Sequence, residues 1–557
     1  MMDTIGKIGL FGLMGLISGW HSAIANTAQF DWFKYQGESA LKVHATQYVN
    51  PILPGFYPDP SITRVKNHYY LVNSSFAYFP GFPIFQSENL VDWKQIGNAF
   101  DRTSQFQLNG IDSSRGMFAP DISYHNGTYY LVSTCVECGQ PFLRNFVLTA
   151  KAPQGPWSTP TTLDFDGIDP SIFWDDDGKA YIVHNGDPIG GSKYDGHKAI
   201  WLQSFDPKTK KMVGQAIQIV NGGVNIQDKP FWIEGPHLFK KDHKYYLIAA
   251  EGGTQNNHSE VVFRADKVTG PYIPYDQNPI LTQRTLDPER KNPVANAGHA
   301  DLVQTQDGQW WAVFLGVRPY DPEGNFNIGR ETFLLPVQWK NGWPVILKNG
   351  KKIPLVVKKP TIDHSKNSHN GSLSYIDSFD QSHLGPQWIS LRTSNTKRYQ
   401  LVDGKLILHA AGKIGDMQKT PAFVGRRLQH QQATISTRLD FTPEQSGDQA
   451  GLVAIQNDRS FLFFGVERLN NQNVIALYKH DQSDKQQLIQ SVPYTAQHVD
   501  LTIHVNRGQM SFDYTVAHQT KTLAAHVDTR FLSTPQAGGF VGTVIGPYSY
   551  HETPPEK

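Results

Sequence analysis

One pattern occurs five times between residues 57 and 314. Each copy has a polar residue, an apolar strand, a polar turn and a second, aromatic-rich strand, as in "YPDPSITRVKNHYYLVN" at 57–73. The turns, for example Asn126-Gly127 and Asp307-Gly308, are typical of β-hairpins. The copies recur about every 50 to 65 residues, which is the length of a propeller blade of several strands. The repeat therefore predicts a five-bladed β-propeller, a closed arrangement that leaves no sheet edge bare.

The rest of the chain has a different character, and 557 residues are too many for one core. We assign residues 48–345 to the propeller and residues 346–374, rich in Lys, Asn and Ser, to a linker. Residues 375–550 contain short segments with alternating apolar and polar residues between turn signals, which is typical of an antiparallel β-sandwich. No amphipathic helix of useful length is evident. The predicted fold class is therefore all-β, with a five-bladed β-propeller followed by a β-sandwich.

The N-terminus has the features of a secretory signal peptide, which we assign to residues 1–25. Lys7 precedes an apolar run at 8–20, and "AIA" at 23–25 is a small-x-small cleavage site. The run is too short to span a bilayer. We expect an exported protein, periplasmic or secreted, with no membrane contact after cleavage. The net charge of +1 gives no broad basic surface, so nucleic acid is not an expected partner.

The only two cysteines, Cys135 and Cys138, lie in "TCVECGQ". An exported protein permits a disulfide between them. A zinc site needs more ligands than this pair, and the chain has no second CxxC. The sequence favours a local disulfide, followed by a buried thiol pair, over metal or redox chemistry.

Five residues stand at the heads of the repeats, where the innermost strands of a propeller begin. They are Asp59, Asp121, Asp169, Glu234 and His299. Innermost strands line the central channel, so we expect these side chains to converge on its axis. Asp59 and Asp169 precede proline, which favours an extended backbone and suits the entry to a strand.

Several carboxylates in one pocket cannot all ionise freely, because like charges raise the pKa of at least one of them. A glycosidase needs such a set: one carboxylic acid protonates the leaving oxygen, and another carboxylate activates water. Each aspartate could instead cap its own turn. Three acids at equivalent repeat positions favour catalysis, whereas Asp121 is interpreted as a supporting hydrogen-bond partner.

Six motifs together resemble glycoside hydrolase family 43. They are "YPDPS", "GIDPSIFWDDDGKAYI", "EGPHLFK", "AEGGTQNNH", "AGHADLV" and "GRETF". The resemblance covers residues 48–550 and is closest to the β-xylosidases and α-L-arabinofuranosidases that carry a C-terminal β-sandwich of the concanavalin-like jelly-roll type. It implies inverting, exo-acting removal of terminal pentose from oligosaccharides. It also implies that Asp59 is the general base, Asp169 tunes and orients the acid, and Glu234 is the general acid.

The resemblance also implies a set of substrate-binding residues. They are Phe76, Phe118, Thr254, His258, His299 and Arg330. Phe118 stands where relatives often have tryptophan, so the exact sugar is left open. No cofactor is required, but relatives often hold calcium or water near the histidine in "AGHAD", which makes His299 a candidate calcium ligand. The alternative is that His299 hydrogen-bonds Asp169 or Glu234.

Two other functions are compatible with the pattern. A fructan- or sucrose-splitting hydrolase also joins a five-bladed propeller to a sandwich, but it retains configuration and carries an "RDP" motif that this chain lacks. A non-catalytic sugar-binding propeller would need no acid–base set. In each case the expected partner is an oligosaccharide, and the chain could also form a homo-oligomer.

Overall fold

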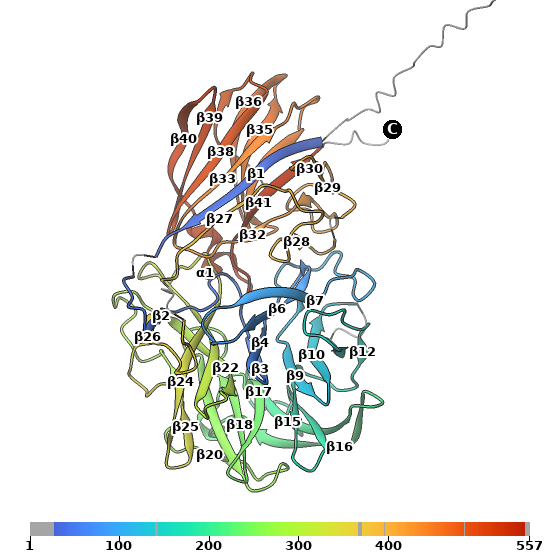
Figure 1. The fold of residues 1–557 in the computed structure, drawn as a ribbon, viewed down its shortest axis with the longest axis vertical. Helices are drawn as coiled ribbons and strands as arrows, with labels where there is room; N and C mark the ends of the chain where they lie inside the picture. Colours follow the sequence, from blue (N-terminus) through green and yellow to red (C-terminus); the bar gives the residue numbers. More distant parts are fainter. Residues whose placement is uncertain are drawn as a thin grey trace, which may run out of the picture.

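The computed structural model describes residues 27–39, 41–139, 143–365, 370–394, 396–483 and 485–551, which form two stacked β domains (Figure 1). The predicted signal peptide lies outside these residues. The helices among them are η1 (Ile226–Asp228), η2 (Arg530–Leu532) and α1 (Thr534–Ala537). No helix in the described ranges is long and apolar enough to cross a membrane. The all-β prediction is confirmed.

Five sheets of four or five strands form the blades of the propeller. Blade one contains β3 (Ser61–Val65), β4 (His68–Val72), β6 (Gly81–Ser87) and β7 (Lys94–Phe100). Blade two contains β8 (Gly116–Met117), β9 (Asp121–His125), β10 (Thr128–Val136), β11 (Leu143–Ala150) and β12 (Thr161–Thr162). Blade three contains β13 (Ile168–Trp174), β14 (Ala180–Gly186), β15 (Ala199–Asp206) and β16 (Lys211–Asn221). Blade four contains β17 (Glu234–Lys241), β18 (Lys244–Glu251), β19 (Ser259–Ala265), β20 (Ile273–Pro274) and β21 (Leu281–Thr282). Blade five contains β22 (Ala295–Gln304), β23 (Trp310–Val317), β24 (Glu331–Lys340) and β25 (Trp343–Val345).

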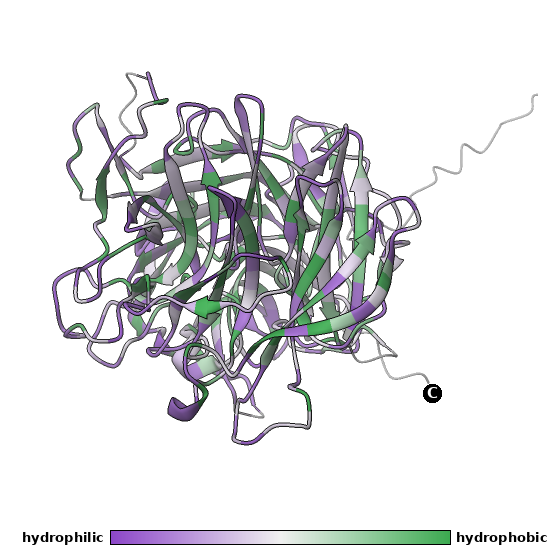
Figure 2. Ribbon diagram, turned by 90° about the horizontal axis from the view of Figure 1, so that it is seen from below, coloured by the Kyte–Doolittle hydropathy of each residue, from purple (hydrophilic) through white to green (hydrophobic). Residues whose placement is uncertain are grey.

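The strands next to the innermost ones in blades one and two, β4 and β10, are buried on both faces. Nearly all side chains of β4 ("HYYLV") and β10 ("TYYLVSTCV") are buried. Val72 and Leu131 belong to one apolar cluster between blades one and two. Such runs bury both faces of a sheet against its neighbours, so the hydrophobic residues concentrate in the strands and the hydrophilic ones in the loops (Figure 2). The packed blades give the repeat heads a rigid base.

Cys135 and Cys138 form a disulfide at the end of β10, with their Cα atoms 5.7 Å apart. Cys135 lies opposite Met117 of β8. Of the three interpretations of this pair, the structure shows the local disulfide.

Two large sheets form the sandwich. The eight-stranded sheet has the order β29-β30-β1-β33-β38-β39-β40, with β27 also beside β1. Its strands are β1 (Thr27–Gly37), β27 (Leu373–Asp377), β29 (Tyr399–Val402), β30 (Lys405–His409), β33 (Gln432–Asp440), β38 (His498–Asn506), β39 (Gln509–Val516) and β40 (Gln519–Asp528). The seven-stranded sheet has the order β31-β41-β34-β35-β36-β37, with β32 also beside β41. Its strands are β31 (Ala422–Phe423), β32 (Arg426–Arg427), β34 (Gln449–Asn457), β35 (Ser460–Leu469), β36 (Gln472–Asp481), β37 (Gln487–Pro493) and β41 (Val544–Tyr550).

The N-terminal strand β1 belongs to the sandwich and not to the propeller. It pairs with β27, β30 and β33, and its Phe30 and Phe33 lie in the sandwich core. This segment was assigned to no domain from the sequence, because its alternating pattern does not show which distant sheet it joins. The next strand, β2 (Gln47–Val49), pairs with β26 (Val356–Lys358).

The sandwich covers one end of the propeller (Figure 1). β5 (Tyr78–Phe79) of the propeller pairs with β28 (Ser390–Leu391), which follows the linker. Close to Asn327, Gly329 has φ +89°, and a Cβ atom there would lie 2.9 Å from the Cα of Gly542. The Thr543 N–H donates to the Asn327 carbonyl at 2.8 Å. The loop before β24 is therefore held against the sandwich.

Candidate active site

The repeat heads form two sets that are offset by two residues. The first set is Asp59, Ala119, Asp169, Gly235 and His299. The second set is Ser61, Asp121, Ser171, His237 and Asp301. Side chains two residues apart on a strand point to the same face, so both sets face the central axis. Within each set, the five residues stand at the same position along their strands and are neighbours at one level of the axis. The prediction that the five heads are equivalent is therefore wrong for Asp121, which belongs to the second set, and for Glu234, which precedes the first set by one residue.

The backbone at the first set is left-handed. The φ angles are +51° at Asp59, +53° at Asp169 and +53° at His299. The extended backbone expected for a residue before proline is thus wrong at both aspartates. A non-glycine residue in this region is strained and persists only where its surroundings fix it. Here the fixed turn directs a polar side chain from each of three strand entries.

Asp59 is a buried carboxylate with three polar neighbours. Its Oδ2 accepts a hydrogen bond from the Ser74 hydroxyl at 2.6 Å, and its Oδ1 accepts one from the Arg330 guanidinium at 3.0 Å. The His299 Nδ1 lies 3.7 Å from the same Oδ1. Burial raises the pKa of Asp59, but Arg330, His299 and Ser74 outweigh it and hold that pKa below its usual value of 3.8. Asp59 is therefore ionised at neutral pH and can accept a proton.

Glu234 and Asp169 have the opposite electrostatics. Burial and then the Asp59 carboxylate raise the pKa of Glu234 to about 7, although Arg330 and a hydrogen bond from the Trp232 side chain lower it. Burial, Glu234 and Asp59 raise the pKa of Asp169 well above its usual value. Glu234 can therefore carry a proton near neutral pH, and the Asp169 carboxyl beside it is also held in its neutral form.

His299 is neutral at neutral pH, because burial lowers its pKa to about 4. Its contact is with Asp59, and in the described part of the chain no hydrogen bond or ion pair joins it to Asp169 or Glu234. The alternative that it bonds one of those two acids is not what the structure shows.

His258 and Thr254 come from the loop between β18 and β19. His258 is buried, its Nδ1 lies 2.9 Å from the Asn296 carbonyl oxygen, and its position affects the pKa of Asp59. Thr254 is half-buried and, within the described ranges, makes no hydrogen bond with the three acids. The structure thus brings His258 to the site, whereas substrate contact by Thr254 stays a prediction.

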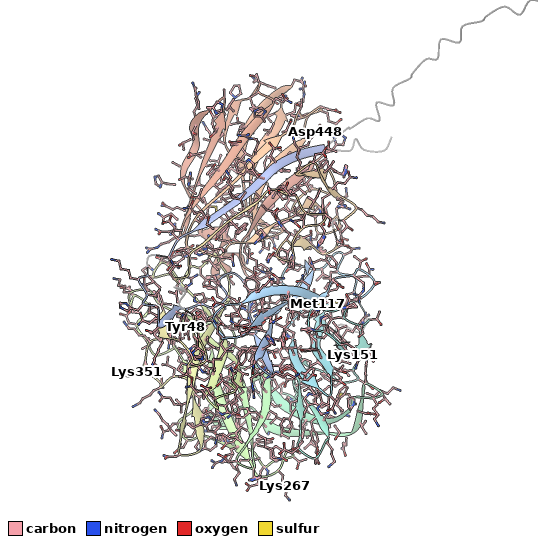
Figure 3. The ribbon with its side chains drawn as sticks, viewed as in Figure 1. Tyr48, Met117, Lys151, Lys267, Lys351 and Asp448 are labelled. Atoms are coloured by element: carbon pink, nitrogen blue, oxygen red, sulfur yellow. A yellow bond between two sulfur atoms is a disulfide. The ribbon has the colours of Figure 1, made fainter. Side chains whose placement is uncertain are left out.

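Three aromatic rings and Arg330 form a wall beside Asp59. The Phe76 ring centroid lies 5.7 Å from that of Phe118 and 5.9 Å from that of Phe540. The Arg330 guanidinium lies over Phe76 and Phe540, 5.8 Å and 5.2 Å from their centroids. The backbone of Phe76 bridges to Met117, which lies at the end of the propeller facing the sandwich (Figure 3). Phe540, which sequence analysis did not identify, brings a sandwich side chain to this wall.

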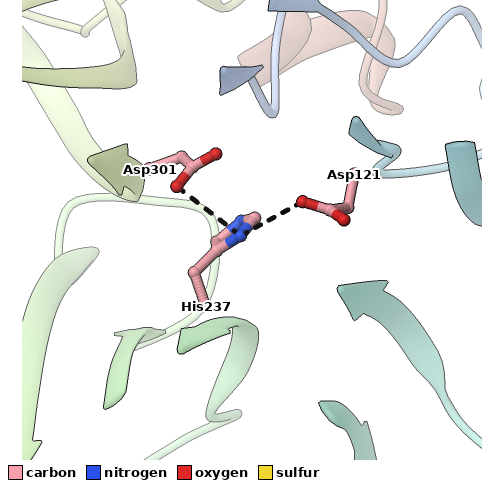
Figure 4. Close-up of side chains that lie close together, drawn as sticks. All are labelled: Asp121, His237 and Asp301. Atoms are coloured by element: carbon pink, nitrogen blue, oxygen red, sulfur yellow. Dashed lines mark ion pairs between the residues drawn. The ribbon is translucent and has the colours of Figure 1, made fainter. Parts of the chain in front are cut away.

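The second set contains a cluster of Asp121, His237 and Asp301 (Figure 4). The His237 Nδ1 lies 3.6 Å from Asp121 Oδ1 and 3.7 Å from Asp301 Oδ1. The Ser61 hydroxyl lies 3.1 Å from Asp121 Oδ1 and 3.0 Å from Asp301 Oδ2. Burial raises the pKa of Asp121 to about 6. Asp121 therefore accepts hydrogen bonds from neighbouring blades near the axis, in agreement with its predicted role as a supporting hydrogen-bond partner.

The cluster does not fit calcium. Calcium takes about six to eight oxygen ligands, but these three side chains offer two carboxylate oxygens and one imidazole nitrogen. Both carboxylates also accept hydrogen bonds from backbone N–H groups: Ile172 donates to Asp121 at 3.0 Å, and Ile62 donates to Asp301 at 2.8 Å. His299 is not part of this cluster, and its role as a calcium ligand stays a prediction.

Two buried carboxyls with opposite pKa shifts in one site are what general acid–base cleavage of a glycosidic bond requires. The fold and the site together define a glycoside hydrolase. The chain belongs to the glycosyl hydrolases family 43, whose model matches residues 48–344, and residues 376–557 match the β-xylosidase C-terminal concanavalin A-like domain. This membership decides against the fructan- or sucrose-splitting alternative and against a non-catalytic sugar-binding propeller.

Similar proteins cover nearly the whole chain. A xylosidase/arabinosidase of Butyrivibrio fibrisolvens is 37% identical over 90% of this chain and 95% of its own length. The non-reducing end alpha-L-arabinofuranosidase BoGH43B of Bacteroides ovatus is 36% identical over 90% of each chain. The crystal structure of a GH43_12 protein from a capybara gut metagenome aligns with a TM-score of 0.87 at 37% identity, covering 94% of this chain and all of that one. A xylan beta-1,4-xylosidase structure from Bacillus halodurans C-125 aligns with a TM-score of 0.81 at 31% identity, covering 90% and 96%.

Four residues of the site and its support were not predicted from the sequence. They are Ser74, Trp232, His237 and Phe540. Two of them had a signal in the sequence: Trp232 lies two residues before Glu234, and His237 is the member of blade four that matches Asp301. Ser74 and Phe540 had none, because their contacts join segments that are distant in sequence.

Proposed function

We propose that this protein removes terminal pentose units, β-D-xylose, α-L-arabinose or both, from xylan- or arabinan-derived oligosaccharides by inverting hydrolysis. The observation that carries the proposal is that one buried site lowers the pKa of Asp59 and raises that of Glu234. The names of the similar proteins, which are xylosidases and arabinosidases, support the choice of sugar.

Asp59 and Glu234 have separate roles in the reaction. Asp59 removes a proton from water as the water oxygen attacks the anomeric carbon. Glu234 gives its proton to the glycosidic oxygen as the bond to the leaving sugar breaks. The family resemblance gives Asp169 the role of tuning and orienting the acid, and the Arg330 guanidinium fixes the Asp59 carboxylate. The two proton transfers balance, and the next cycle starts after Asp59 loses a proton and Glu234 gains one.

The test compares nitrophenyl β-D-xylopyranoside with nitrophenyl α-L-arabinofuranoside and follows the released sugar by NMR. Inversion predicts that a β-xyloside first releases α-xylose. First release of β-xylose would contradict the mechanism, and no turnover of either pentoside or of pentose oligosaccharides would contradict the proposed substrate.

The pH dependence follows from the two shifts. Glu234 must be protonated, so kcat/KM is expected to fall as pH rises through about 7. Asp59 must be ionised, and because its pKa is lowered, activity is expected to persist down to about pH 4. Trp232→Phe removes a hydrogen bond that lowers the pKa of Glu234, so the basic limb should move to higher pH. A basic limb that is unmoved in this variant would contradict the contact.

Phe540→Ala is expected to raise KM with little change in kcat, because the ring belongs to the wall and not to the acid–base set. The rise should be roughly 5- to 10-fold, since an aromatic contact contributes about 1 kcal/mol. Phe531→Ala, in the same C-terminal segment but under Lys479 of the sandwich, is the matched control and should leave KM unchanged. An unchanged KM in Phe540→Ala would contradict the prediction that the sandwich contributes to substrate binding.

Export is also part of the proposal. The Cys135–Cys138 disulfide supports it, because disulfides persist in oxidising compartments. Cell fractionation and N-terminal sequencing should find a mature chain that begins near Asn26 in the periplasm or medium. A cytoplasmic protein that keeps residues 1–25 would contradict it.

A further inference from the structure

Glu260 is a buried carboxyl that the reaction does not use. It lies on β19 of blade four with no exposed surface. Its Oε2 accepts a hydrogen bond from the Ala300 N–H at 2.9 Å, whereas its Oε1 has no hydrogen-bond partner in the described ranges. A buried carboxyl without a full set of hydrogen bonds lowers the stability of the folded protein, so a functional role would explain its presence.

The contact of Glu260 is with the turn that carries His299. The Ala300 N–H, directly after His299, donates to this carboxyl, and the backbone N–H of His299 lowers its pKa. The turn is strained, because Asn296 and His299 both have φ +53°. A conformation of this kind persists only where neighbouring groups fix it.

His258, the residue directly before β19, holds the other side of the same turn. His258 binds the Asn296 carbonyl, and a Cβ atom at Gly298 would lie 2.8 Å from its Nε2. Glu260 is itself fixed, because the Ile280 N–H donates to its carbonyl oxygen at 2.8 Å. Strand β19 and the residue directly before it thus hold the head of blade five from two positions.

We propose that Glu260 is a positioning residue for this reaction, which fixes the left-handed turn and thereby directs His299 at Asp59. The inference rests on the proposed function, because the turn matters for hydrolysis only if the Asp59 site cleaves sugar. Glu260 itself lies beneath the turn and is not a catalytic residue.

The carboxyl acts as a neutral hydrogen-bond acceptor. Burial and then the Asp301 charge raise the pKa of Glu260 well above its usual value, against the lowering by the two N–H groups. Glutamine has the shape of this neutral form and keeps the acceptor oxygen, whereas methionine has a similar length and no oxygen. The two substitutions therefore separate the hydrogen bond from simple filling of the core.

The experiment measures kcat/KM and thermal unfolding for Glu260→Gln and Glu260→Met on the better nitrophenyl pentoside. Glu260→Gln should stay close to the parent. Glu260→Met should lose about 30-fold or more in kcat/KM, since a misplacement of about 1 Å can cost on the order of 100-fold. Parent-like kcat/KM in the Met variant would overturn the proposal, and so would an equal loss in a Gln variant that unfolds at the parent temperature.

Two controls distinguish positioning from general damage. Glu467→Met removes a buried, hydrogen-bonded carboxyl in the sandwich and should lower the unfolding temperature without a matching loss in kcat/KM. In a His299→Ala background, Glu260→Met should have almost no further effect, because residues that act through one group are not additive. A repeat of the full loss in that background would overturn the link to His299.

A readout without activity separates this inference from the proposed function. The imidazole NMR signal of His299, assigned by its absence in His299→Ala, should be the same in the parent and Glu260→Gln and should shift in Glu260→Met. An unshifted signal in the Met variant would overturn the inference even if the enzyme is active. A shifted signal in a protein that cleaves no pentoside would support the positioning and refute only the proposed function.

Discussion

Glu234→Ala is expected to lower kcat on an unactivated pentose disaccharide by about 100- to 10,000-fold, the usual contribution of a general acid. The loss on a nitrophenyl pentoside should be much smaller, because nitrophenolate leaves without being protonated. The basic limb of the pH profile should also disappear, since the group that titrates near pH 7 is gone.

The difference between the two leaving groups is the diagnostic result for Glu234. Equal losses on both substrates would contradict its role as the acid. Asp177→Ala is the matched control, because this carboxyl belongs to the same propeller but lies at the exposed turn between β13 and β14. It should have parent-like kinetics on both substrates.

Asp59→Asn is expected to lower kcat by about 100- to 10,000-fold on both kinds of substrate, because each requires activated water whatever its leaving group. The Asp59 charge raises the pKa of Glu234, so its removal should also move any residual basic limb to lower pH. Residual activity with an unmoved limb would contradict the coupling of the two groups.

The loss in Asp59→Asn must be separated from unfolding, because Arg330 would keep a buried charge without its carboxylate. Asp448→Asn is the control. Asp448 is a buried aspartate that bonds His551 at the far end of the sandwich (Figure 3). It should reduce stability and leave kcat/KM unchanged, whereas retained activity in Asp59→Asn would refute the assignment of the base.

The repeat predicted the propeller because hairpin turns and apolar strands are local features. The same repeat predicted equivalent positions for Asp59 and Asp169, and both stand at one position relative to their strand. It misplaced Asp121, because a shift of two residues moves a side chain to the next level of the axis and the repeat does not show the level. It also gave the wrong backbone at both aspartates, because tertiary contacts of the kind seen between Asp59, Ser74 and Arg330 override the local preference of a residue before proline.

The sequence by itself determined the all-β class and the number of blades, and it favoured the disulfide over the other two interpretations of the cysteine pair. Each of these follows from residue types and short spacings. The tertiary structure alone decided that β1 joins the sandwich, that Phe540 reaches the wall beside Arg330, and which contacts lower the pKa of Asp59 and raise that of Glu234. Pairing between distant strands and the burial of charges depend on which segments meet in space, and no local pattern records that.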